Sequence, residues 1–168
     1  MSPASSILIL CRTNSVTSTM IEALLNANEH AGWRAFSAGP EPALTVNTHT
    51  MSALKNSGIS ARFVTSPKCW HLFEGPDAPR FDVVLTVSED VSWDGMPKWN
   101  GVPRLLHWPL PDPLALSCTP AERAGLFAAL LDLAATRVEA FLEEEREAVR
   151  VGSIANDNSW LPSGRVGT

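Results

Sequence analysis

A cysteine at position 11 ends a short apolar run and precedes a stretch of small polar residues. Residues 7–11 read Ile-Leu-Ile-Leu-Cys, and residues 12–19 read Arg-Thr-Asn-Ser-Val-Thr-Ser-Thr. Where a strand, a polar loop and a helix follow one another, backbone N–H groups curl around an anion and the helix start adds roughly half a positive charge. The same field favours the nucleophilic thiolate form of a cysteine at the loop entrance. The pattern predicts a reactive sulfur beneath a bound oxyanion, and an inert buried thiol at a strand end is the alternative.

Composition narrows the class of protein. The chain has 168 residues, 45% of them apolar and 18% charged, which is typical of one globular domain. Eighteen acidic and thirteen basic residues give a net charge of −5 without a local basic cluster, so nucleic acid is not an expected partner. The spacing of three cysteines and four histidines indicates neither a disulfide framework nor a metal site. No nucleotide P-loop motif is present, and no cofactor is expected.

The apolar run before the polar loop is too short to be a targeting signal. No lysine or arginine precedes residues 7–11. A secretory signal needs roughly 7–15 apolar residues behind a positive start, and a membrane span needs about 20. We therefore expect no membrane association and a cytoplasmic protein, because a reducing compartment suits cysteines that form no disulfide framework.

Predicted strands and helices alternate around this loop. The patterns predict strands over 5–11, 33–37, 81–87 and 104–107, and helices over 18–31, 45–57 and from 119 to about 149. This alternation predicts an α/β domain with a parallel sheet over residues 1–149, followed by a C-terminal tail over 150–168 in which Trp160-Leu161 is a candidate docking point. Ligands of such sheets bind beyond the carboxyl ends of the strands, where the loop after Cys11 lies.

Local signals predict the helix boundaries. Ser18 or Thr17 is expected to cap the first helix, and Gly32 and Gly58 to stop the first and second. Residues 119–122 read Thr-Pro-Ala-Glu, which combines a threonine cap, proline at the first helical position and glutamate at the third. The helix that follows is expected to bury an apolar stripe of Leu126, Leu130, Leu133, Val138 and Leu142.

Residues 7–25 resemble the start of the low-molecular-weight tyrosine phosphatases and their relatives, the thioredoxin-coupled arsenate reductases. That family begins with a strand, a Cys-x5-Arg-Ser loop with an internal asparagine, and a helix. Later segments are similar to the family in the same order, up to about residue 142: Phe36–Pro42, Val46–Asn47, Met51, Gly58–Ile59, Ser66–Lys68, Phe81–Thr86 and His107–Pro113. The resemblance implies a phosphotyrosine phosphatase I-like fold, in which three layers contain a four-stranded parallel sheet.

The resemblance also implies roles for single residues. Cys11 corresponds to the nucleophile, Asn14 to the asparagine that holds the loop, Ser18 to the serine that donates to the thiolate, and Asp112 to the acid that protonates the leaving oxygen. Such an acid contributes typically 10²–10⁴-fold in rate. Without the family comparison, Asp112 belongs to a plain Pro-Asp-Pro turn. The residues expected to bind the oxyanion are Arg12, Thr13, Asn14, Ser15, Val16, Thr17 and Ser18.

Three residues depart from the family pattern within this loop. Thr17 stands where the family has the arginine that clamps the oxyanion with charge-assisted bonds. Thr13 replaces a glycine, which strains the loop if that position needs a positive φ. Arg12 directly follows the nucleophile, where the family usually has an uncharged residue. Its side chain either reaches the anion or points to solvent.

The thiol relay of the arsenate reductases is not expected here. Residues 87–90, after the third predicted strand, carry no cysteine, and Cys69 and Cys118 are expected to be structural. A reductase with this sequence would use an external thiol such as glutathione. Leu114-Ala115, where the phosphatases often have aromatic residues, favours the arsenate-reductase branch.

Two functions remain. One is an enzyme of the phosphotyrosine phosphatase type or an arsenate reductase, acting on a phosphate ester or arsenate through Cys11 and Asp112. The other is a non-catalytic relative that binds an oxyanion or a phosphorylated partner. The presence of both Cys11 and Asp112 favours the enzyme, and Thr17 favours the binding protein.

Overall fold

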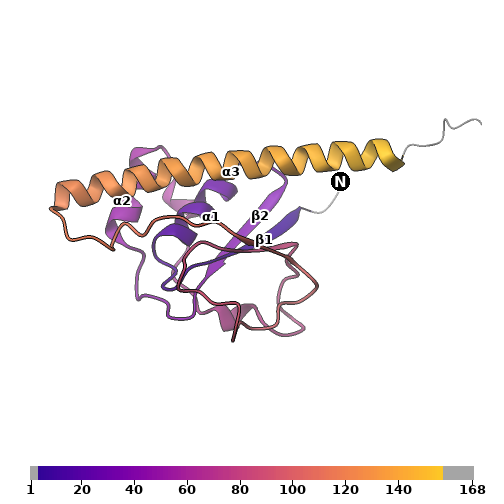
Figure 1. The fold of residues 1–168 in the computed structure, drawn as a ribbon, viewed down its shortest axis with the longest axis horizontal. Coiled ribbons are helices and arrows are strands. Elements are labelled where there is room, and N and C mark those ends of the chain that lie inside the picture. Colours follow the sequence, from indigo (N-terminus) through magenta and orange to yellow (C-terminus); the bar gives the residue numbers. More distant parts are fainter. Residues whose placement is uncertain (1–3, 157–168) are drawn as a thin grey trace, which may run out of the picture. The chain divides into compact units, whose positions relative to one another are not determined.

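The computed structural model describes residues 4–156. Its elements alternate as the sequence predicts (Figure 1). The strands are β1 (Ser5–Leu10), β2 (Trp33–Ala38), β3 (Val83–Thr86) and β4 (Arg104–His107), and the helices are α1 (Thr17–Ala27), α2 (Thr48–Asn56) and α3 (Pro120–Asn156), with short 3-10 helices η1 (Ala61–Phe63) and η2 (Trp70–Phe73). Trp160 and Leu161, the candidate docking point, lie outside the described residues.

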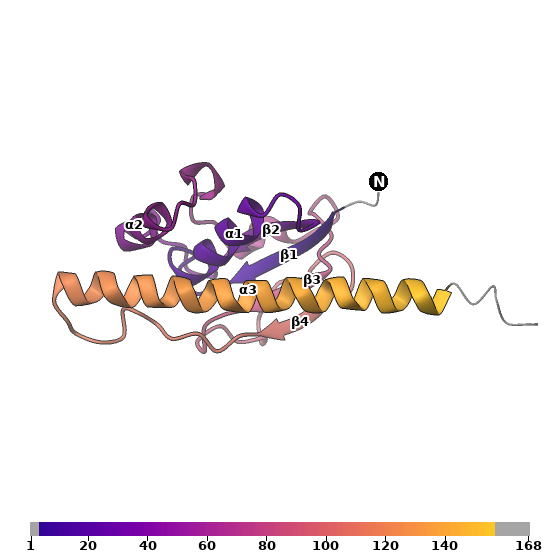
Figure 2. The same cartoon turned by 90° about the horizontal axis from the view of Figure 1, so that it is seen from above.

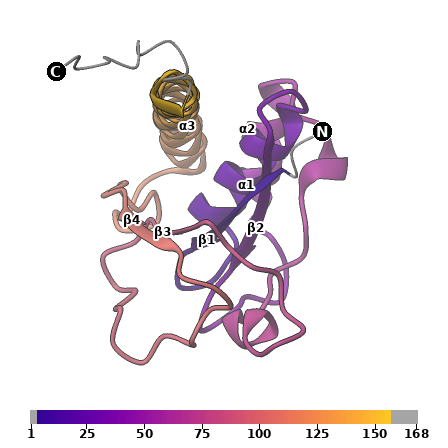
Figure 3. The same ribbon diagram turned by 90° about the vertical axis from the view of Figure 1, so that its right-hand side faces the viewer.

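The strands form one parallel sheet in the order β2-β1-β3-β4 (Figure 3). Ile7 of the inner strand β1 pairs with Ala35 on one side and with Val83 on the other. Residues 7–10 are fully buried, because the sheet is covered on both faces as the apolar run predicted. The predicted α/β fold with a four-stranded parallel sheet is confirmed.

Two apolar clusters pack the elements, and Figure 2 shows the strands and helices from above. One lies among the helices, where α1, α2 and the start of α3 share a cluster that includes Met20, Leu54 and Phe127. The other covers a face of the sheet, where η2 and the neighbouring loops place Trp70 against Leu8 and other sheet residues. The predicted three layers are present, and the layer opposite the α-helices consists of loops and a 3-10 helix.

The predicted stripe of α3 is confirmed in part. Leu130, Val138 and Leu142 are buried, whereas Leu126 and Leu133 are 37% and 42% exposed. Phe127 and Leu131, each next to a predicted position, are buried with Leu130 against α1 and α2, so packing turns the buried face slightly from the predicted one.

The third helix is also longer than predicted. It continues to Asn156 instead of ending near Val149, because a glycine within a helix costs only about 1 kcal/mol relative to alanine and does not stop it. Within the described residues the chain divides into two compact units between Val138 and Glu139. The predicted division between residues 149 and 150 stays a prediction. None of the helices within residues 4–156 combines the length and apolar character that crossing a bilayer requires.

The boundaries of α1 correct two expectations. Val16 occupies the N-cap position and makes no side-chain cap, so the predicted capping by Thr17 or Ser18 is wrong. Both residues lie inside the helix, and the Ser18 hydroxyl contacts the thiol of Cys11 instead. The helix ends at Ala27, four residues before the expected end.

Side chains cap the other two α-helices. In α2, Asn47 Oδ1 accepts the His49 N–H at 2.9 Å, and Gly58, with φ +78°, follows the helix end as predicted. At α3, Thr119 Oγ1 accepts the Glu122 N–H at 3.2 Å while the Glu122 carboxylate accepts the Thr119 N–H at 2.8 Å. The sequence predicted this reciprocal capping box, whose hydrogen bonds lower the pKa of Glu122.

Replacing the α3 cap should therefore destabilise the protein. We expect Thr119→Ala to lower the free energy of unfolding by about 1 kcal/mol, since the Glu122 N–H loses its partner. The matched control is Thr136→Ala on the same helix, where a mid-helix alanine has the higher helix propensity. Urea denaturation measures both variants. Equal losses in the two would contradict a capping role for Thr119.

Candidate active site

Residues 11–18 run from the end of β1 into the first turn of α1, at the carboxyl end of the sheet, and are called the Cys11 loop below. Its carbonyl groups are held from outside by the chain that follows β2. The carbonyls of Arg12, Thr13 and Ser15 accept backbone N–H groups of Glu41, Ala43 and Asn47 at 3.0, 2.9 and 3.1 Å. The Thr50 hydroxyl also donates to the Ser15 carbonyl, at 3.0 Å. These bonds fix the direction of three peptide planes.

The N–H groups of the same peptides point the other way. In a planar trans peptide the C=O and the following N–H are opposed, so the N–H groups of Thr13, Asn14 and Val16 face away from residues 41–50. No backbone or side-chain acceptor within residues 4–156 receives an N–H of residues 12–16. Unpaired donors in series at a helix start are the arrangement that binds anions.

Asn14 holds the loop in this shape. Its φ is +50°, a left-handed conformation that asparagine tolerates better than most residues, and its side chain is buried. The amide Nδ2 donates to Ser18 Oγ at 2.9 Å and to Ser37 Oγ at 2.8 Å, and Oδ1 accepts the Lys68 backbone N–H at 2.8 Å. Within residues 4–156 the positive φ outside glycine falls on Asn14, so Thr13 in place of a glycine causes no strain.

Cys11 is buried, and its Sγ lies 2.9 Å from Ser18 Oγ. Because Ser18 Oγ already accepts the Asn14 amide, its own hydrogen is left to donate to the sulfur. A hydroxyl that donates to sulfur stabilises the thiolate form. The contact between Ser18 and Cys11 that the family resemblance implied is present in the structure.

Gly39 allows the turn after β2 to lie on the Cys11 loop. A Cβ at this position would stand 2.2 Å from the Cys11 carbonyl oxygen and 2.5 Å from that of Arg12. Any side chain would therefore push the two backbones apart. The sequence showed the Ser-Ala-Gly turn as part of the resemblance, but the close approach itself is visible only in the structure.

Sequence reasoning missed the buried carboxylate of Glu22. This residue of α1 is 3% exposed and accepts hydrogen bonds from Ser37 Oγ and, at 3.1 Å, from Thr65 Oγ1. Burial raises the pKa of Glu22, and the nearby Lys68 ammonium lowers it in part. Burial also lowers the pKa of Lys68, which the Glu22 carboxylate opposes. A glutamate between apolar residues of the predicted helix was the sequence feature that could have revealed this buried carboxylate.

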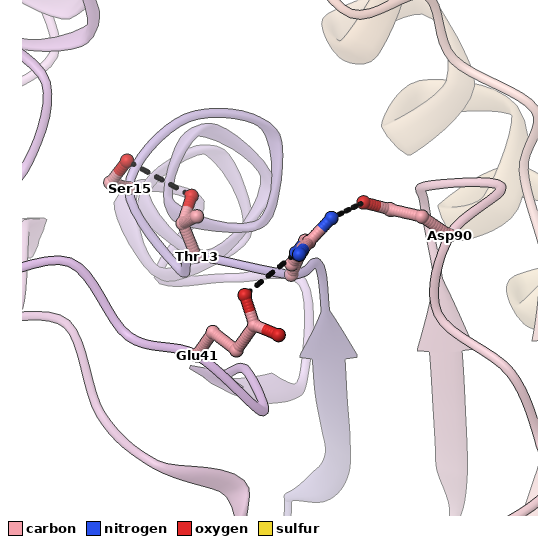
Figure 4. A network of polar contacts seen from close by, with 5 residues as sticks. Thr13, Ser15, Glu41 and Asp90 are labelled. Carbon is pink, nitrogen blue, oxygen red and sulfur yellow. Dashed lines mark hydrogen bonds and ion pairs between the residues drawn. The ribbon is translucent and has the colours of Figure 1, made fainter.

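The Arg12 guanidinium pairs with Glu41 and Asp90, with Nε 2.8 Å from Glu41 Oε2 and Nη1 3.5 Å from Asp90 Oδ2. Figure 4 labels these two carboxylates and marks the contacts with dashed lines. The pair with Glu41, and then that with Asp90, raises the pKa of Arg12. Its side chain is 53% exposed. The cation therefore lies at the rim of the Cys11 loop, paired with two carboxylates.

Asp112, Thr17 and His107 differ in their contacts and burial. The Asp112 side chain is exposed, and its Oδ1 accepts the Leu114 N–H at 2.8 Å in a local turn. Thr17 is buried as the first residue of α1, without a charge to offer an anion. His107 Nδ1 pairs with Thr86 Oγ1 at 2.8 Å, which is the structural role expected of it. No group of metal-ligating side chains occurs within the described residues.

Solved structures contain the same arrangement of elements. Arsenate reductase from Archaeoglobus fulgidus aligns with a TM-score of 0.62 and 25% identity, over 82% of this chain and 98% of that one. The YwlE arginine phosphatase of Geobacillus stearothermophilus aligns at 0.57 and 18% identity, over 86% and 94% of the two chains. A low-molecular-weight phosphotyrosine phosphatase from Vibrio cholerae aligns at 0.60 and 15%, over 86% and 99%.

The chain has the fold of these low-molecular-weight phosphatases and arsenate reductases. The resemblance first noted in residues 7–25 is thereby confirmed for the fold. The proteins with which it aligns are enzymes. No protein-family model matches the sequence, and no curated protein matches it either. The likeness is therefore carried by the structure more than by the sequence.

The buried Glu22 predicts a pH-dependent stability. Its pKa is raised on folding, so its contribution is complete below the ordinary glutamate range and is lost as pH rises through the folded-state value. We expect the free energy of unfolding of Glu22→Gln, relative to wild type, to increase from pH 4 to pH 7. Urea titrations at several pH values test this, with exposed Glu144→Gln as the control. A difference that stays level with pH would contradict the assignment.

Proposed function

We propose that this protein is a cysteine-dependent enzyme that acts on a small phosphate ester or on arsenate. The observation that carries the proposal is the Cys11 sulfur, which accepts from Ser18 inside a loop whose N–H groups have no acceptor among the described residues. An arsenate reductase solved in a phosphate-binding state shares the fold, with 18% identity over 83% of this chain, and supports an oxyanion ligand.

The proposed reaction with a phosphate ester has two steps. The Cys11 thiolate attacks phosphorus, so that an S–P bond forms while the bond from phosphorus to the leaving oxygen breaks, and Asp112 protonates that oxygen. Water then attacks phosphorus, Asp112 takes a proton, and Cys11 leaves as thiolate with inorganic phosphate. The loop N–H groups stabilise the charge on the non-bridging oxygens in both steps.

The hydrogen bonds of Asp112 and Ser18 are compatible with the roles proposed for them. Asp112 Oδ1 is used by the Leu114 N–H, which leaves Oδ2 for the leaving group. Ser18 stabilises Cys11 as attacking group and as leaving group, since both steps involve its thiolate.

With arsenate, the same attack would form an S–As bond and release water after protonation. A second thiol then attacks the Cys11 sulfur, so that an S–S bond forms while the S–As bond breaks, and arsenite leaves as arsenic(III) with the two electrons of that bond. A further thiol reduces the mixed disulfide and restores Cys11. Residues 87–90 carry no cysteine, so we propose an external thiol as the electron donor. A reducing compartment such as the cytoplasm would supply it and would keep Cys11 reduced.

A second candidate function is binding of an oxyanion or a phosphorylated partner without turnover. The loop supports this candidate because Thr17 replaces the expected arginine and the Arg12 guanidinium is paired with Glu41 and Asp90. An anion would then be held by backbone N–H groups and the start of α1. The two candidates share a binding site and differ in turnover.

Hydrolysis of an aryl phosphate, together with alkylation of Cys11, distinguishes these functions. We expect wild type to hydrolyse para-nitrophenyl phosphate and Cys11→Ser to lose at least about a hundredfold in rate, because the hydroxyl is a far weaker nucleophile than a thiolate. Iodoacetamide at pH 6 should label Cys11 faster than Cys69 or Cys118, and phosphate should slow that labelling. Protection without hydrolysis favours the binding protein. Equal labelling of the three cysteines without protection would contradict both functions.

Thr17 offers a test of the missing charge. Removal of one preorganised donor typically costs about 10²–10³-fold in rate, and charge-assisted bidentate bonds are roughly twice as strong as neutral ones. We expect Thr17→Arg to tighten phosphate binding and to raise aryl phosphate turnover at least tenfold, with Cys11 still required. Thr17→Ala is the matched control and should show no gain.

Arg12→Ala tests whether Arg12 already contributes, in which case phosphate binding weakens. Folded variants in which neither change has an effect would contradict an oxyanion site in this loop.

A further inference from the structure

A series of buried hydrogen bonds leads from the nucleophile to β2. Cys11 Sγ is 2.9 Å from Ser18 Oγ, which accepts the Asn14 amide at 2.9 Å. The same Nδ2 group donates to Ser37 Oγ at 2.8 Å. All four residues are at most 6% exposed. Because these groups are buried and share hydrogen bonds, the donor and acceptor roles of Ser37 limit those of Asn14, Ser18 and Cys11.

The series continues outward through a carboxylate to an ammonium. Ser37 Oγ donates to Glu22, and Thr65 Oγ1 donates to both Glu22 oxygens at 3.1 Å. Thr65 Oγ1 in turn accepts from Lys68 Nζ at 2.5 Å, and Nζ also donates to the Ser66 carbonyl at 3.0 Å. Lys68 is half-buried, at the outer end of the series.

The chemistry of the groups fixes most of these directions. An ammonium has no acceptor, so Thr65 accepts from Lys68 and gives its hydrogen to Glu22. An ionised carboxylate only accepts, so Ser37 must donate to Glu22, and its lone pair is left for the Asn14 amide. An ionised Glu22 accepts from both hydroxyls, and this set of bonds fits that form.

A buried carboxylate that is linked to Cys11 through Ser37, Asn14 and Ser18 would by itself oppose formation of a second anion there. The Lys68 ammonium, bridged to Glu22 through Thr65, balances that charge. The other cation beside the loop, Arg12, is paired with its own carboxylates at the rim. Lys68, in the segment between η1 and η2, is thus the cation that is linked to Glu22.

We propose that Lys68 is a positioning residue of the Cys11 site, whose ammonium keeps Glu22 ionised and charge-balanced so that the serine and asparagine bonds favour the Cys11 thiolate. This rests on the proposed role of Cys11 as nucleophile. Without the ammonium, an ionised Glu22 would repel the thiolate.

The test measures the alkylation rate of Cys11 as a function of pH by mass spectrometry of the full chain. We expect Lys68→Met and Lys68→Gln to move the midpoint of the rate profile up by roughly half to one pH unit, which is about three- to tenfold slower labelling at pH 6. Lys68→Arg should restore the wild-type profile because the charge returns. Lys98→Met, at an exposed loop lysine, is the matched control and should leave the profile unchanged.

The Glu22→Gln background separates this role from a direct effect of charge. With a neutral side chain at position 22, Lys68→Met should shift the profile by less than half as much as in wild type. An equal shift in both backgrounds, or no shift in Lys68→Met and Lys68→Gln, would overturn the proposal while leaving the proposed function intact. Wild-type Cys11 that labels no faster than Cys69 and Cys118 would overturn both.

Discussion

Three hydrogen bonds to the Asn14 side chain connect the Cys11 loop to β2 and to the chain that leads into η2. The amide donates to Ser18 and Ser37 and accepts from the Lys68 backbone, so one buried side chain sets the loop curvature and the orientation of the hydroxyl beside the sulfur. An asparagine is suited to this place because it tolerates a positive φ and has donors and an acceptor on one planar group. The carbonyl bonds from residues 41–50 then complete the loop from outside.

The charges of the site are arranged differently from those expected of the family. Neither cation beside the Cys11 loop lies at the position of the missing arginine, since Arg12 is paired with Glu41 and Asp90 and Lys68 is linked to Glu22. An oxyanion would depend on backbone N–H groups and the start of α1, which bring partial charges only. Exposed ion pairs such as those of Arg12 are weak and screened by salt, so this guanidinium is the cation most readily available to an incoming anion.

The order of the elements and the place of the site could be predicted from the sequence, whereas several local details could not. The run of residues 7–10 is apolar throughout and is buried on both faces, and the capping box at Thr119 formed because all of its partners lie within four residues. Two positions of the α3 stripe were mispredicted, because only packing against α1 and α2 selects Phe127 over Leu126. The local pattern assigned the Ser18 hydroxyl to a cap, whereas its contact with Cys11, implied by the family resemblance, forms when the loop folds back.

By itself, the sequence determined the alternation of strands and helices, the loop after Cys11 and the residues that lie in it, since these depend on periodicity and on neighbours along the chain. Only the tertiary structure decided the contacts between distant segments. Gly39 meets the Cys11 carbonyl, Glu22 is buried against Ser37 and Thr65, and Arg12 is held by carboxylates that follow β2 and β3. The physical reason is that burial and pairing are properties of the packed chain: a charge has an acceptable energy in the interior only beside partners that the fold brings to it.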